Sequence, residues 1–176
     1  MKENTDQSRG MGLVGASWGV AGVSLLIGSA VIQISEVAIE AFSYPFRWFH
    51  WAFLVVFFVV MLFSEGYRGF QLGFSPRVAA RARYLSRNPR PLHVLLAPLL
   101  CMGFIHATKR RQRSAIILTL AIVMFVVLVR LLNQPWRGIV DLGVVGGLVW
   151  GLVALWVFTY VAFARETFDF PPDLPE

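Results

Sequence analysis

Long runs of apolar residues dominate this chain, and polar residues gather in the short stretches between the runs. A helix that crosses a hydrocarbon core of about 30 Å needs roughly 20 apolar residues, because each residue adds about 1.5 Å along the helix axis. The spanning segments must be helices, since the hydrocarbon offers no water to satisfy backbone polar groups. Four runs reach the required length, and we predict spans at 11–35, 46–66, 114–133 and 139–164.

A fifth apolar stretch, 91–108, is ambiguous because it contains two prolines and has clusters of Arg and Lys on both sides. If this stretch crossed the membrane, 10 Lys and Arg would lie on the side of the N-terminus and 6 on the other side. If it were re-entrant or interfacial, the split would be 13 to 3. Cytoplasmic loops have the excess of Lys and Arg. We therefore predict four full spans plus a re-entrant or short fifth membrane helix, with both termini in the cytoplasm.

A polar helix is predicted between the second span and the ambiguous stretch. Ser75 followed by Pro76 is typical of a helix start, and the helix predicted over 76–88 has one apolar face, formed by Val78, Ala82 and Leu85. Arginines flank this face, as in amphipathic helices that lie on anionic lipid. We predict that the following side chains contact lipid headgroups of the inner leaflet: Arg77, Arg81, Arg83 and Arg87.

Composition supports a membrane location. Of the 176 residues, 57% are hydrophobic and 15% charged, whereas ordinary soluble domains are about 25% charged. This composition argues against disorder and against an ordinary soluble enzyme. We predict an all-α integral membrane protein, a polytopic helical bundle in which a single transmembrane domain, 11–164, lies between a polar N-terminal tail, 1–10, and a Pro-rich acidic C-terminal tail, 165–176.

Glycines recur at intervals of four residues in the first and last predicted spans. Such spacing lets helices approach closely in a bilayer, where small residues are enriched at helix contacts. We interpret the two stripes as tight packing of these two helices within one subunit, in preference to a dimer interface or a sliding surface for transport. The residues concerned are Gly15, Gly19, Gly143, Gly147 and Gly151.

Charged residues near the span ends are candidate functional sites, because charge in or near hydrocarbon is costly. They are Glu36, Glu65, Arg68, Arg130, Arg137 and Asp141. One interpretation is a path for an ion, a proton or a polar solute, and the other is structural charge at the membrane boundary. For Asp141 we predict a cationic partner, either Arg137 or Arg130, because an arginine can reach a carboxylate and still extend outward.

The sequence provides no catalytic, metal or cofactor motif. Phosphate-binding and dinucleotide-binding glycine loops are missing, as is the spacing of histidines that binds zinc. The single cysteine, Cys101, excludes an internal disulfide framework. His93 and His106 are 13 residues apart, about 20 Å along a straight helix, which is too far to share one haem iron. We therefore predict no catalytic residues, no metal and no cofactor.

These observations favour a non-catalytic accessory, assembly or scaffold subunit of a membrane complex. Its expected partners are membrane lipids and other membrane subunits or further copies of itself, and not nucleic acid. A small transporter or channel-like protein is the first alternative, and an enzyme acting on lipid headgroups at the inner face is the second. Short loops and an arginine-rich composition favour a bacterial inner membrane, with an organellar membrane as the alternative.

Overall fold

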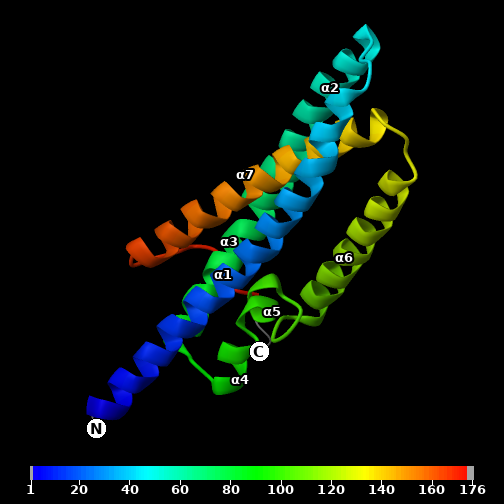
Figure 1. Cartoon of the computed structure of the whole chain (residues 1–176). Helices are drawn as coiled ribbons and strands as arrows, with labels where there is room; N and C mark the ends of the chain where they lie inside the picture. Colours follow the sequence, from blue (N-terminus) through cyan, green and yellow to red (C-terminus); the bar gives the residue numbers. More distant parts are fainter. Residues whose placement is uncertain (1, 174–176) are drawn as a thin grey trace.

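A computed structural model describes residues 2–173 of the chain and shows an all-α protein with no strand among these residues (Figure 1). Among the described residues, four continuous helical stretches are long and apolar enough to cross a membrane, which confirms the predicted helical membrane bundle. The elements are α1 (Lys2–Glu40), η1 (Ala41–Ser43), α2 (Trp48–Met61), the π-helix η2 (Leu62–Phe74), α3 (Ser75–Arg87), α4 (Pro91–Leu95), α5 (Ala97–Met102), α6 (Lys109–Arg130) and α7 (Trp136–Ala164).

Three of the four long stretches pack into one bundle, and α6 stands beside it (Figure 1). The bundle consists of α1, the continuous helix α2–η2–α3, and α7. The start of α7 meets the end of α1, where the Gln134 side-chain amide donates a hydrogen bond of 3.2 Å to the Val37 carbonyl. Of the residues of α6, all of which the structure describes, Val129 alone is buried.

The second long stretch is one helix from Trp48 to Arg87, and the predicted helix start at Ser75 is wrong. The hydroxyl of Ser75 does not cap a helix but donates to the Gly151 carbonyl at 3.3 Å. A proline inside a helix lacks an N–H and crowds the carbonyl four residues earlier. The widened turns of η2 come immediately before Pro76 and open the helix at this point, so the helix passes through the proline. It ends at Asn88, as predicted.

The ambiguous segment 91–108 folds as two short helices, α4 and α5, neither of which is long enough to cross a membrane. The chain reverses after α5 at Gly103, whose φ of +89° is readily adopted only by glycine. The segment therefore begins and ends at the same end of the bundle, where α3 ends and α6 begins (Figure 1). We call this the basic end, and the fold agrees with the prediction of a re-entrant or short fifth helix.

The main apolar core lies towards the basic end and joins four elements. It consists of Ala16, Val20, Val23 and Ile27 from α1, Val78 and Ala82 from α3, Cys101 from α5 and Leu155 from α7. The predicted apolar face of α3 is confirmed, since Val78, Ala82 and Leu85 are all buried. However, α3 does not lie on a membrane surface as predicted. It is packed between α1, α5 and α7.

The first helix also differs from the sequence-based boundaries. Because α1 begins at Lys2, the segment predicted as a polar tail continues the first span as helix. The C-terminal segment leaves α7 at Arg165 and returns across the basic end as far as Asp173. This return brings the segment predicted as a Pro-rich acidic tail into contact with α3 and α6.

Candidate functional site

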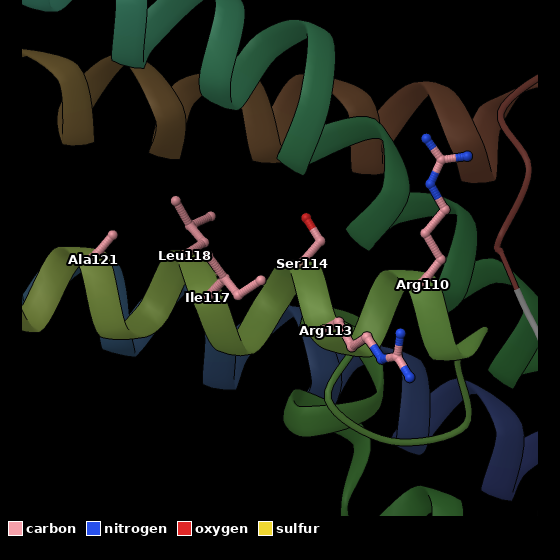
Figure 2. Close-up of a pocket in the computed structure, with 6 residues that line it drawn as sticks. All are labelled: Arg110, Arg113, Ser114, Ile117, Leu118 and Ala121. Carbon is pink, nitrogen blue, oxygen red and sulfur yellow. The ribbon is translucent and has the colours of Figure 1, made fainter.

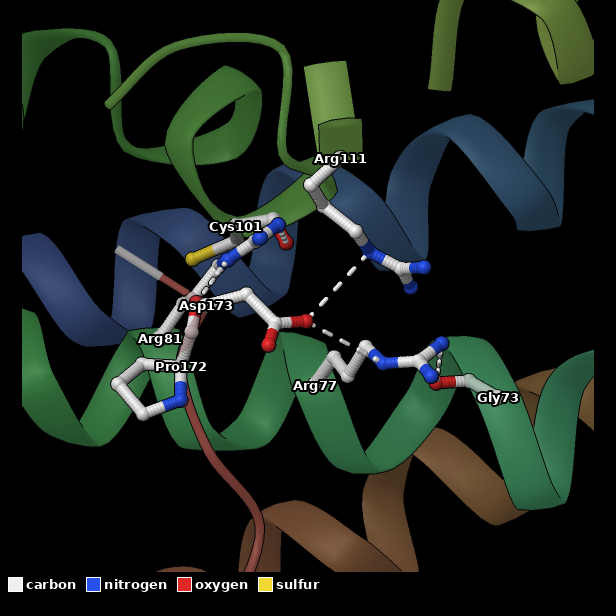
Figure 3. Close-up of polar contacts among 7 residues, drawn as sticks. All are labelled: Gly73, Arg77, Arg81, Cys101, Arg111, Pro172 and Asp173. Atoms are coloured by element: carbon white, nitrogen blue, oxygen red, sulfur yellow. Dashed lines mark hydrogen bonds and ion pairs between the residues drawn. The ribbon is translucent and has the colours of Figure 1, made fainter. Parts of the chain in front are cut away.

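A cluster of arginines surrounds the C-terminal segment at the basic end (Figure 3). Arg77 of α3 and Arg111 of α6 place their Nε atoms 3.6 Å and 3.7 Å from the same carboxylate oxygen of Asp173. The backbone N–H of Thr108, just before α6, donates to the Asp173 carbonyl at 3.1 Å. Asp173 therefore ties the C-terminal segment to both helices. This contact could not be predicted from the sequence, because nothing local to residues 165–176 indicates that they return to the bundle.

Arg81 is buried inside this cluster, with 1% of its surface exposed. Its Nε donates to the Pro172 carbonyl at 2.8 Å, and its Nη1 donates to the Cys101 carbonyl at 3.3 Å. Within residues 2–173, its Nη2 has no hydrogen-bond partner. The prediction that Arg81 contacts lipid headgroups is therefore wrong, because α5 and the C-terminal segment cover this side of α3 (Figure 3).

The other three arginines of α3 differ in their surroundings. Arg77 is half-buried, pairs with Asp173 and also donates to the Gly73 carbonyl at 3.0 Å. Arg83 donates to the backbone carbonyl of Glu166, in the returning C-terminal segment. Arg87, at the end of the helix, is exposed. Contact with lipid headgroups stays a prediction for these three residues.

Two adjoining hollows lie beside the arginine cluster. The first is a pocket of about 350 Å³ lined by Arg77, Thr108, Arg110, Arg111, Ser114 and Asp173, which we call the basic pocket. The second is an open groove of about 570 Å³ along α6, lined by Arg110, Arg113, Ser114, Ile117, Leu118 and Ala121, which we call the α6 groove. The two share Arg110 and Ser114. In Figure 2, Arg110, Ser114 and Leu118 point from α6 to the side on which α3 passes.

The remaining charged candidates do not form one site. Asp141 lies 3.7 Å from Arg137, one turn earlier in α7, and only 13% of its side chain is exposed. This contact agrees with the predicted cationic partner and selects Arg137, since Arg130 is exposed on α6. Glu36 is exposed on α1, and Glu65 and Arg68 are exposed on η2. Among the described residues, no three His, Cys, Asp or Glu lie close enough to hold a metal ion.

Both glycine stripes pack within the chain, as predicted, but they do not pack against each other. Gly15 and Gly19 of α1 face Leu85 of α3 and the α4–α5 segment. In α7, Gly143 and Gly147 face α2 and the start of η2, and Gly151 faces Phe70 of η2. Gly138, which lies outside the predicted stripe, is also buried, and a Cβ there would overlap the Cβ of Ala41.

The two histidines of the ambiguous segment lie close together, with ring centroids 4.6 Å apart. The separation of about 20 Å expected for a straight helix is wrong, because the reversal at Gly103 folds His106 back towards α4. Burial lowers the pKa of His93, and the neighbouring His106 and Arg90 lower it further. Burial and these two neighbours therefore favour the neutral form of the His93 ring.

Converging guanidinium groups are suited to bind a phosphate or a carboxylate, because each presents several N–H donors in a fixed plane. The basic pocket is therefore the candidate binding site that the geometry supports. Comparison with protein-family models, with curated proteins and with solved structures found no match to this chain.

Proposed function

We propose that this chain is a non-catalytic accessory, assembly or scaffold subunit of a membrane complex, and that α6 is the helix to which another subunit docks. The isolation of α6 is the observation that supports the proposal. The other long helices pack against one another in the bundle, whereas α6 lies apart, makes few contacts with α7 and is exposed along nearly its whole length (Figure 1).

A helix in a bilayer gains little by leaving lipid for another apolar surface, so helices associate through close packing and polar contacts. An isolated helix has made few of these contacts and retains its faces for a partner. At about 100° per residue, Ile116, Thr119 and Val123 share the face of α6 opposite the α6 groove. All three are exposed. Ala115 and Thr119 add a pair of small residues at the four-residue spacing that favours close approach.

The proposed setting is the inner membrane of a bacterium, with the chain crossing several times and both termini in the cytoplasm. The Lys and Arg excess of the basic end supports this orientation, because such excess marks the cytoplasmic side. At the end of the bundle opposite the basic end, the start of α2 has two exposed tryptophans, with Trp48 81% exposed and Trp51 50% exposed. Tryptophans are typical of the interface between lipid and water.

Photo-crosslinking from α6 in living cells tests the proposal. The photoreactive residue p-benzoylphenylalanine replaces Val123 in one variant and Val55 of α2 in the control. These two valines are 55% and 57% exposed, so they differ chiefly in whether their helix belongs to the bundle. We expect irradiation to join the Val123 variant to a different membrane protein in stoichiometric yield, with no such product from the Val55 variant.

Two results would contradict the proposal. Adducts with lipid alone from both variants would mean that α6 is a lipid-facing helix with no docked subunit. Adducts only with a second copy of the chain would favour the alternative of a small transporter or channel-like protein that acts as an oligomer.

A further inference from the structure

We infer that the basic pocket and the α6 groove together form a binding site for one anionic phospholipid. The phosphate lies among Arg77, Arg110 and Arg111, and one acyl chain lies along α6. This inference does not depend on the docking of a subunit, because the α6 groove and the proposed docking face are on opposite sides of α6.

The net charge of the basic pocket is complementary to that of a phosphate headgroup. Its three arginines and single aspartate leave a net charge of +2. A phosphomonoester has a charge of about −1.5 to −2 near neutral pH, and basic pockets between membrane helices are known to hold anionic headgroups. The volume of about 350 Å³ is within the usual range of ligand pockets, roughly 300–1,000 Å³.

The arginines of the basic pocket also retain hydrogen-bond donors that can bind a phosphate. Arg77 and Arg111 each approach Asp173 through Nε, at 3.6 Å and 3.7 Å, which is longer than the roughly 2.7–2.9 Å of a strong charge-assisted hydrogen bond. Arg110 is exposed at the start of α6, where the free N–H groups of the helix favour an anion. The carboxylate of Asp173 thus neutralises the arginines only in part.

The α6 groove suits an acyl chain and decides between a lipid and a soluble phosphate. Past Ser114 its lining changes from arginine to Ile117, Leu118 and Ala121, which lie three and four residues apart on one face of α6 (Figure 2). A charged pocket that opens into an apolar groove follows the order of headgroup and chain in a phospholipid. A soluble phosphate has no acyl chain and would leave the apolar part of the α6 groove empty.

Lipid binding to the purified full-length chain in dodecyl maltoside tests the headgroup half of the site. The probe is dioleoyl phosphatidic acid, with zwitterionic dioleoyl phosphatidylcholine and inorganic phosphate as comparisons, and binding is measured by native mass spectrometry. Arg111→Gln removes a charge from the basic pocket, and Arg165→Gln removes the same charge from an exposed position just after α7. We expect Arg111→Gln to weaken binding of phosphatidic acid by about tenfold or more, the effect of losing a charged hydrogen bond, and Arg165→Gln to change it less than twofold.

A second pair of variants tests the part of the site that binds the acyl chain. Both substitutions are on α6, away from the packed helices of the bundle. Leu118→Trp fills the α6 groove, and Val123→Trp places the same side chain on the opposite face of α6. We expect the first to weaken binding at least fivefold and the second to leave it unchanged. Equal effects of the two variants within each pair, or equal binding of the two lipids, would overturn the inference. Inorganic phosphate that displaces phosphatidic acid completely would show a site for a free anion and would overturn it as well.

Discussion

Replacing Gly19 by alanine is expected to destabilise the contact between α1 and α5. Gly19 is buried where the two helices meet, and a Cβ at this position would lie 2.8 Å from the Cys101 sulfur and 3.3 Å from the Ala97 Cβ. Atoms in favourable contact are about 3.5–4.0 Å apart, so the helices have to separate by several tenths of an ångström or more. Cys101 has no room to move away, because it is fully buried in the main core.

The expected magnitude follows from this geometry. Inserting a methyl group into a well-packed contact costs about 1–3 kcal/mol, and about 2 kcal/mol lowers Tm by roughly 4–8 °C in a protein of this size. Gly28 provides the matched control, because it lies on the opposite side of the same helix. Within the described part of the chain, no atom comes within 4 Å of a Cβ placed there. Gly28→Ala should be neutral or stabilise α1 by up to about 1 kcal/mol, since alanine favours helix more than glycine does.

Thermal unfolding of both variants and the wild type in the same detergent measures the difference. We expect the Tm of Gly19→Ala to fall below the wild-type value and that of Gly28→Ala to equal or exceed it. If both variants keep the wild-type Tm, or if Gly28→Ala is the less stable, α1 does not pack against α5 as described.

Further predictions concern the thiol, the ion pair and the buried guanidinium. Burial raises the pKa of Cys101 to about 12, so alkylation at pH 8 should be about a thousandfold slower in the folded than in the unfolded chain. The stability gained by burying the neutral thiol is present below about pH 8.5 and is lost as pH rises towards 12; equal alkylation rates would contradict this. The variants Arg137→Gln and Asp141→Asn should be non-additive in unfolding by about 0.5–3 kcal/mol, whereas Arg130→Gln with Asp141→Asn should be additive. Arg81→Met removes two charged hydrogen bonds, each worth about 1.5–3 kcal/mol, and should speed proteolysis after Arg165; an unchanged cleavage rate would show that Arg81 does not hold the C-terminal segment.

The spans could be predicted from the sequence because their cause is local. The length of an apolar run and the helical state are both imposed by the bilayer on each segment separately. The behaviour of 91–108 followed from charge alone, since a crossing would have placed Lys109 and its neighbours away from the other basic residues. The apolar face of α3 followed from helical spacing and was confirmed at Val78, Ala82 and Leu85.

The site depends on contacts between distant segments, and these left little trace in the sequence. Arg81 lies three residues after Val78 and four before Leu85, a spacing that places it beside the buried face. This spacing indicates that Arg81 is buried, whereas the charge of an arginine favours contact with lipid headgroups. The structure shows that Arg81 is buried. The proximity of His93 to His106 depends on the reversal at Gly103, and a straight-helix distance does not apply across it. Asp173 reaches Arg77 and Arg111 only because the C-terminal segment folds back, and no periodicity marks such a return.

In the fold described above, 91–108 returns to the side of the membrane from which it starts, so that both basic clusters lie at one end. Single cysteines at exposed positions, introduced in a Cys101→Ala background and labelled with a membrane-impermeant maleimide in sealed vesicles of either orientation, test it directly. Asn88→Cys and Lys109→Cys flank the segment, and Ser43→Cys lies at the opposite end of the bundle. We expect positions 88 and 109 to be labelled from the same side and position 43 from the other. Labelling of 88 and 109 from opposite sides would contradict it.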